Sequence, residues 1–190
     1  MTRFHPIVLL PPGTPVLDLS RPTAFAAAPV WSIGRYDEDR GVYTQGLFQA
    51  DGEPRTVHLG IDLGGPAGVA VHAFADGVVT HAGVDAAHGG YGGVLVTRHR
   101  VDGDPLWVLH GHLSHASLEH SPVGRVVRAG DVIGWLGTEA ENGGWPPHVH
   151  VQLCVDAPTH FDVPGVFRRS ERAAARARHP DPRRILGPLY

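Results

Sequence analysis

Trp145-Pro-Pro-His-Val-His-Val-Gln-Leu-Cys154 is the segment that most constrains the fold. It has two prolines after its first residue, which a helix interior does not tolerate, and then alternates polar and apolar residues. The alternation predicts a half-buried β-strand. Its apolar residues are expected to face a core, and its polar residues to share the opposite face. The first set comprises Val149, Val151, Leu153 and Val155, and the second comprises His148, His150, Gln152 and Cys154.

The two histidines of this strand are expected to lie roughly 6.5–7 Å apart on one face, because they are two residues apart. That distance is too long for both imidazoles to bind one tetrahedral zinc ion, whose Zn–N bonds are about 2.0–2.1 Å. The spacing favours a division of roles, in which one imidazole binds a metal and the other contacts a substrate. Taken alone, the pattern is equally compatible with two solvated histidines on a polar strand.

His58-Leu-Gly-Ile-Asp62 is an H-x-G-x-D element that supplies two more candidate ligands. Gly60 and the Gly-Gly-Pro that follows the element disfavour a helix. In a straight strand His58 and Asp62 would be roughly 13 Å apart, so a turn or bulge at Gly60 is expected to bring them together. With a histidine from a distant strand they form a His/Asp/His set. Three protein ligands leave the fourth zinc position open, which is the pattern of catalytic sites.

Three motifs, in this order, resemble the signature elements of lysostaphin-type zinc endopeptidases. They are His58-x-Gly-x-Asp62, His-Leu-Ser at 112–114 and Pro-His-Val-His at 147–150. The resemblance covers roughly residues 55 to 155 and implies the duplicated hybrid motif type of fold, with two antiparallel sheets that form a groove. By position in the motifs, it implies that His58, Asp62 and His150 bind Zn²⁺. It also implies catalytic roles for His112 and His148, as general base and as oxyanion or leaving-group partner, in an order that stays open.

The resemblance implies an endopeptidase that hydrolyses peptide (amide) bonds of peptidoglycan type, with a peptide or peptidoglycan-derived substrate. A closer likeness, carried by Arg55–Leu63, Glu141–His148 and Pro182–Gly187, is to the peptidase-like domain found fused to class III aminotransferases, here as a stand-alone form. That likeness favours an alternative, a cytoplasmic zinc hydrolase of a small amide or biosynthetic intermediate. A non-catalytic binding module of the same fold is a third alternative, which the presence of all five site residues disfavours.

Composition supports an all-β protein, because 25 glycines and 17 prolines divide a chain of 190 residues into short apolar runs. The formal net charge of -3 gives no electrostatic footprint for nucleic acid. No run reaches the ~18–20 apolar residues of a membrane span, and Ile7–Leu10 is shorter than the roughly 7–15 residues of a secretory signal core. A cytoplasmic protein without membrane insertion is expected, or an exported one whose signal has been removed. The oligomeric state stays open.

The chain is expected to form a single globular domain in three parts. These are an N-terminal wrap over residues 1–54, a zinc peptidase-like core over 55–156 and a C-terminal extension over 157–190. Ser170–Arg178 has an N-cap residue, good helix formers and a following proline, which predict a short helix. Asp76-Gly77 is a two-residue hairpin signal, and Asp102-Gly103 predicts another turn.

Several other residues could lie near such a site without the sequence fixing a role for them: His110, Tyr36, Tyr43, Cys154, Glu139 and Glu141. His110 is expected to be a neighbour of the site rather than a ligand. Packing is the preferred interpretation for the two tyrosines and the cysteine. For the two glutamates, a solvated loop is preferred over a role as general base.

Overall fold

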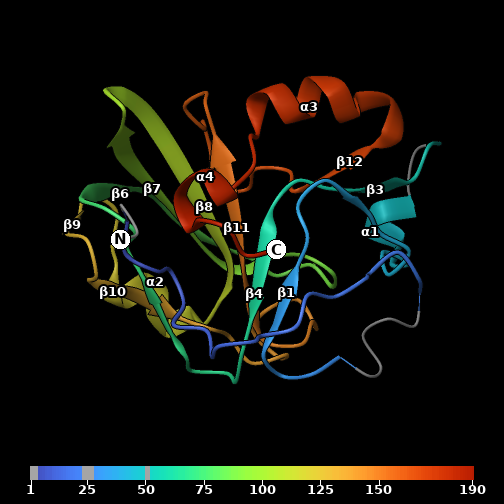
Figure 1. Cartoon of the computed structure of the whole chain (residues 1–190), viewed down its shortest axis with the longest axis horizontal. Coiled ribbons are helices and arrows are strands. Elements are labelled where there is room, and N and C mark those ends of the chain that lie inside the picture. Colours follow the sequence, from blue (N-terminus) through green and yellow to red (C-terminus); the bar gives the residue numbers. More distant parts are fainter. Residues whose placement is uncertain (1–3, 23–27, 50–51) are drawn as a thin grey trace.

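A seven-stranded antiparallel sheet forms the centre of the molecule, with strand order β1-β4-β11-β8-β7-β6-β9 (Figure 1). The computed structural model describes residues 4–22, 28–49 and 52–190. Strands account for 35% of these residues and helices for 13%, which confirms the all-β prediction. The strands of the large sheet are β1 (Ser32–Gly34), β4 (Ile61–Gly64), β6 (Gly77–Asp85), β7 (Gly92–Val101), β8 (Asp104–Leu113), β9 (Val126–Val127) and β11 (His148–Cys154).

Two smaller sheets complete the strand arrangement. β5 (Ala70–His72) pairs with β10 (Val132–Trp135), and β3 (Arg55–His58) lies between β2 (Glu38–Asp39) and β12 (Val166–Arg168). The sequence predicted one smaller sheet and did not anticipate the three-stranded one. In that sheet a strand from each terminal segment pairs with the strand that carries His58.

The described helices are all short: α1 (Gly46–Gln49), α2 (His115–His120), the 3₁₀ helix η2 (Arg169–Glu171), α3 (Arg172–Arg178) and α4 (Arg183–Leu186). The predicted C-terminal helix is confirmed as η2 and α3. Ser170 is not its N-cap, because its hydroxyl donates to Glu53 Oε2 at 2.5 Å and Glu171 precedes α3. Among the described residues, no helix is long and apolar enough to cross a membrane.

The main core lies against one face of the large sheet. On β11 the side chains of Val149, Val151 and Leu153 are all fully buried there, as predicted from the alternation. The prediction for Val155 is wrong, because β11 ends at Cys154 and Val155 is 41% exposed. The other face of the sheet carries the polar side chains of the same strand.

The two Asp-Gly signals have different outcomes. Asp102 (φ 57°) and Gly103 (φ 94°) connect β7 and β8, and two positive φ values are those of a type I′ hairpin turn. Asp76-Gly77 does not close a hairpin, because β5 pairs with β10 whereas β6 pairs with β7 and β9. The turn predicted at Asp102-Gly103 is therefore confirmed, and the hairpin predicted at Asp76-Gly77 is wrong.

Candidate metal centre

Four residues in register form a row across the polar face of the large sheet. Gly34 on β1 pairs with Asp62 on β4, Asp62 pairs with His150 on β11, and His150 pairs with Gly111 on β8. The glycines at the two ends provide space. A Cβ atom at Gly34 would lie 2.8 Å from Asp62 Oδ2, and one at Gly111 would lie 2.5 Å from the Tyr91 ring. The sheet thus places a carboxylate and an imidazole side by side with room around both.

The connection between β3 and β4 adds His58 to this row. Leu59 and Gly60 separate the two strands, and His58 Nε2 lies 3.2 Å from Asp62 Oδ1. This confirms the predicted turn at Gly60. A Cβ atom there would lie 2.3 Å from Cε1 of His150, so only glycine lets the turn pass beneath that ring.

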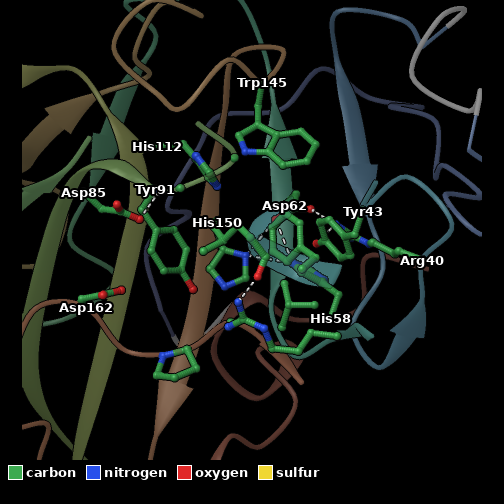
Figure 2. Close-up of a pocket in the computed structure, with 18 of the residues that line it drawn as sticks. Arg40, Tyr43, His58, Asp62, Asp85, Tyr91, His112, Trp145, His150 and Asp162 are labelled. Carbon is green, nitrogen blue, oxygen red and sulfur yellow. Dashed lines mark hydrogen bonds and ion pairs between the residues drawn. The ribbon is translucent and has the colours of Figure 1, made fainter. Parts of the chain in front are cut away.

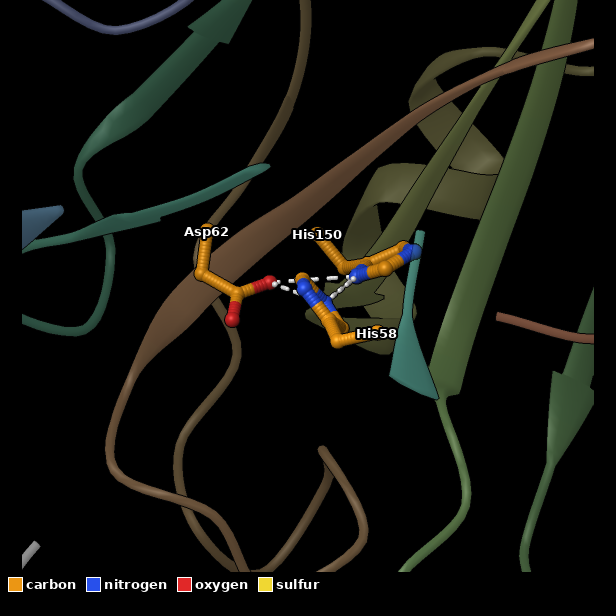
Figure 3. Close-up of side chains that lie close together, drawn as sticks. All are labelled: His58, Asp62 and His150. Carbon is orange, nitrogen blue, oxygen red and sulfur yellow. Dashed lines mark hydrogen bonds and ion pairs between the residues drawn. The ribbon is translucent and has the colours of Figure 1, made fainter. Parts of the chain in front are cut away.

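Three ligand atoms converge at the centre of the site (Figure 3). His58 Nε2 lies 2.8 Å from His150 Nδ1, and Asp62 Oδ1 lies 3.1 Å from His150 Nδ1 and 3.2 Å from His58 Nε2. Bonds of about 2.0–2.1 Å in a tetrahedral site place ligand atoms about 3.3 Å apart. The three atoms therefore form a triangle that fits a zinc ion with little adjustment.

Hydrogen bonds on the far side of each ring fix the proton positions. His58 Nδ1 lies 3.0 Å from the Arg35 carbonyl, to which only an N–H can donate. The Gln152 amide donates to the Pro164 carbonyl at 2.9 Å, so its Oε1 faces His150 Nε2 at 3.0 Å and accepts from it. Both imidazoles consequently direct a lone pair toward Asp62 Oδ1. The two nitrogens and the carboxylate oxygen are all acceptors, and at such short distances they repel one another unless a cation lies between them.

The charge states agree with metal binding. Burial, with the nearby Arg40 as a further cause, lowers the pKa of His58 to about 3, so the ring is neutral. Burial alone would raise the pKa of Asp62, but His58 and Arg40 hold it well below its ordinary value. Neutral imidazole and ionised carboxylate are the forms that bind zinc.

The other two predicted histidines border this triangle. His148 Nε2 lies 3.9 Å from Asp62 Oδ1, and the rings of His112 and His148 are 4.2 Å apart between centroids. His112 has a φ of 62°, and the β7–β8 register shifts between Gly93 and Leu95. This irregularity turns His112 onto the polar face although Gly111, its neighbour, already occupies that face.

Far-side hydrogen bonds also orient these two rings. His112 Nδ1 lies 2.9 Å from the Asn142 carbonyl and His148 Nδ1 lies 2.7 Å from the Pro146 carbonyl. Each ring therefore keeps its proton on Nδ1 and an unprotonated Nε2. Burial lowers the pKa of both rings, which favours the neutral form.

Of the residues whose roles stayed open, some line the pocket and others lie outside it. Tyr43 lines the site. Tyr36 lies outside it, where its hydroxyl donates to the His179 carbonyl at 2.7 Å. His110 is fully buried on the core face and does not line the pocket, so it is not the neighbour of the site that was expected. Glu141 accepts from Thr138 Oγ1 at 2.8 Å and from the backbone N–H of His115 at 3.2 Å, and it does not line the pocket. Cys154 is buried, and burial raises the pKa of its thiol to about 12.

The site lies in a pocket whose walls include residues that the sequence did not single out (Figure 2). Trp145 packs edge-on against Tyr43 with ring centroids 5.9 Å apart, and Tyr91 lies 5.4 Å from the rings of both His112 and His150. Arg40 donates to Asp62 Oδ2 at 2.6 Å. Strand alternation places Gln152 on the histidine face without assigning it a role, whereas Arg40 carries no such signal.

A family model and several known proteins match part of this chain. The sequence matches peptidase family M23 over residues 56–162, more than half of the chain. It is 38% identical over 100 residues to the DD-carboxypeptidase/endopeptidase Mpg of Neisseria meningitidis serogroup B and to that of Neisseria gonorrhoeae. The match covers 53% of this chain and 20% of those relatives, so the chain spans about a fifth of their length.

Two solved structures are also similar. One is a mutant catalytic domain of the prophage-encoded M23 protein EnpA from Enterococcus faecalis, at 26% identity over 56% of this chain and 75% of that chain, with a TM-score of 0.44. The other is the catalytic domain of the antimicrobial peptidase lysostaphin from Staphylococcus simulans, at 24% identity over 60% of this chain and 77% of that chain, with a TM-score of 0.44.

Proposed function

Because the chain belongs to peptidase family M23, we propose that it is a zinc-dependent peptidase that hydrolyses peptide (amide) bonds of the kind found in peptidoglycan. The convergence of His58 Nε2, Asp62 Oδ1 and His150 Nδ1 within 2.8–3.2 Å carries the proposal. Each imidazole has its proton on the far side of the ring, so the three atoms are all acceptors. Two imidazole nitrogens and one carboxylate oxygen are typical ligands of a catalytic zinc.

His58, Asp62 and His150 would hold the ion. When bound, zinc polarises the scissile carbonyl and lowers the pKa of water enough to make hydroxide available near neutral pH. The chain's part is to direct a lone pair of each of these three side chains toward the ion. The Arg35 carbonyl and Gln152 hold the tautomers of the two imidazoles, and Arg40 favours the ionised form of the carboxylate.

His112 and His148 are the proposed acid–base residues. Their Nδ1 protons are held by the Asn142 and Pro146 carbonyls, so Nε2 of each ring is free to accept a proton. The ring that removes a proton from the attacking water then carries it on Nε2 and can pass it to the leaving amine, whereas the other ring stabilises the developing oxyanion only in its Nε2-protonated form. The neutral form favoured by burial suits the ring that acts as base.

The pocket walls favour a peptide as substrate. Tyr43, Phe48 and Trp145 form a buried aromatic cluster on one side, and Tyr91 lies on the other. Flat apolar walls beside a polar centre accommodate an extended chain and exclude water from the reacting bond.

Incubation of zinc-loaded protein with peptidoglycan stem peptides, bridge peptides and a dipeptide library, followed by mass spectrometry, tests the proposal. We expect cleavage of stem or bridge peptides, abolished in His150→Ala and unaffected in His81→Ala. Cleavage confined to dipeptides would point to a small-amide hydrolase. Peptide binding without any cleavage would identify a binding module.

A further inference from the structure

Arg40 is a buried cation that no motif of the family match contains. It follows β2 in the N-terminal segment, outside residues 56–162, and its exposure is 2%. A buried guanidinium is costly unless all its donors find acceptors. The acceptors around Arg40 therefore indicate its role in the fold.

The guanidinium contacts four acceptors at the edge of the site. Nε donates to Glu38 Oε2 at 3.0 Å, and Nη2 donates to the Arg35 carbonyl at 3.2 Å. Nη1 donates to Asp62 Oδ2 at 2.6 Å and to the Tyr43 hydroxyl at 3.1 Å. One planar group thus joins the N-terminal segment to a proposed ligand and to the pocket wall (Figure 2).

The contact with Asp62 divides the two carboxylate oxygens. Oδ1 faces the nitrogens of His58 and His150, whereas Oδ2 is taken by Arg40. The fold makes room for this pair, because a Cβ atom at Gly34 would lie 2.7 Å from Arg40 Nη2 and 2.8 Å from Asp62 Oδ2. Asp62 therefore has a single oxygen to offer to a metal.

The contact with Arg35 extends to a second proposed ligand. The same carbonyl oxygen accepts from Arg40 Nη2 and lies 3.0 Å from His58 Nδ1. Movement of Arg40 would thus disturb both the carboxylate and the acceptor that fixes the His58 tautomer.

We propose that Arg40 is a positioning residue of the metal centre: it restricts Asp62 to binding through one oxygen and, through the Arg35 carbonyl, fixes the orientation of His58. The inference rests on the proposed function, since it concerns the same zinc site. It adds that the N-terminal segment supplies a necessary part of that site. The role assigned to Arg40 is exerted through Asp62 and the Arg35 carbonyl.

Zinc affinity and cobalt spectroscopy test this role without measuring hydrolysis. The dissociation constant is measured by competition with a chromophoric chelator, and coordination number by the visible spectrum of the Co²⁺ form. We expect Arg40→Met to weaken zinc binding about 10–100-fold, the usual effect of removing a partner behind a ligand. Its Co²⁺ bands should weaken, because a freed Asp62 can bind through both oxygens and raise the coordination number.

Arg40→Met leaves Glu38 and Asp62 without their partner, so the second variant is Arg40→Lys, which keeps the charge. A single ammonium cannot reproduce the planar fork, and we expect a smaller loss of zinc affinity in this variant. Wild-type affinity and spectrum in Arg40→Lys would overturn the inference, whether or not Arg40→Met folds.

Arg172→Met is the matched control. Arg172 binds Asp37 through Nε at 2.8 Å and so ties the same N-terminal segment to α3 without contacting a proposed ligand. Its zinc affinity and Co²⁺ spectrum should equal those of the wild type. An equal loss in Arg172→Met would mean that loosening of the segment, rather than the contact with Asp62, is responsible. Absence of zinc binding in the wild type would instead defeat the proposed function itself.

Discussion

His110 is a histidine buried among apolar side chains on the core face of β8. Its cross-strand neighbours Leu95 and Val151 are fully buried, and neither of its ring nitrogens has a hydrogen bond of good geometry. A buried polar atom without a partner costs about 1–3 kcal/mol. We expect His110→Leu, a change of similar volume, to raise the free energy of unfolding by about that amount, measured by urea denaturation.

His99→Leu is the control for this substitution. His99 is buried nearby, but its nitrogens lie 3.0 Å from the Asp76 carbonyl and 2.8 Å from Thr97 Oγ1. Its replacement should lower stability, because those polar atoms lose their partner. A less stable His110→Leu protein would contradict the prediction.

The same two histidines predict a dependence of stability on pH. Burial lowers the pKa of His110 to about 3, with His99 a further cause, and burial lowers the pKa of His99 to about 4. An unfolded histidine titrates near 6.5. Below about pH 6.5 the unfolded chain binds more protons, so stability falls as pH falls, by about 1.4 kcal/mol per pH unit for each histidine.

Above about pH 6.5 neither histidine contributes a pH dependence. The urea midpoint, measured with chelator present, should therefore decrease more between about pH 7 and about pH 5 for the wild type than for His110→Leu. Equal slopes would show that His110 is not held neutral in the folded protein.

At the scale of single residues, the motifs identify the side chains that converge but not the groups that orient them. His58 and Asp62 follow from an H-x-G-x-D element, whereas the choice of His150 over His148 on the alternating strand follows from the family resemblance. The Arg35 carbonyl is a backbone atom, so no residue type marks it. Arg40 is 22 residues from Asp62, and the pairing of β1 with β4 and of β2 with β3 brings their segments together.

Strand β11 separates the proposed ligand His150 from the proposed acid–base residue His148. His150→Ala should lower zinc content well below one per chain, measured by atomic emission, whereas His148→Ala and His112→Ala should retain it. Hydrolysis in the last two should fall on the order of 10²-fold or more. Zinc loss in His148→Ala with retention in His150→Ala would reverse the two roles. His120→Ala, on α2, is the control with both properties unchanged.

The connection between β3 and β4 depends on Gly60. Because an added Cβ would lie 2.3 Å from the His150 ring, Gly60→Ala should displace that ring and weaken zinc binding on the order of 10-fold or more. Gly46→Ala is the matched control, since a Cβ atom there meets nothing within 4 Å. Chelator competition measures both. Wild-type affinity in Gly60→Ala would show that the ring can move without loss of the site.

At the scale of elements, local signals predict a turn but not which strands it joins. Asp102-Gly103 closes a hairpin because β7 and β8 are neighbours, whereas Asp76-Gly77 connects strands in different sheets. The irregularity at His112 is equally invisible in sequence. Regular alternation would place it on the opposite face from Gly111, and the register shift beside it reverses this.

Zinc should stabilise the whole molecule if the proposed site binds it only in the folded state. Free zinc at about 100 times its dissociation constant adds about 2.7 kcal/mol to the free energy of unfolding. We expect Tm to rise when the chelator-treated protein receives zinc in that excess. His58→Ala should show no such rise, and an equal rise in that variant would place the ion elsewhere.

The three-stranded sheet and the groups that hydrogen-bond the proposed ligands imply an order in which the site forms during synthesis. His58 depends on the Arg35 carbonyl, whereas His150 depends on Gln152, whose amide contacts Pro164 and lies 3.1 Å from His179. All three proposed ligands leave the ribosome before the last of these partners does. We therefore expect the pocket to form late, after the segment around His179 has packed against β11. An incomplete chain should bind metal weakly, and activity should appear only when both flanking segments are in place.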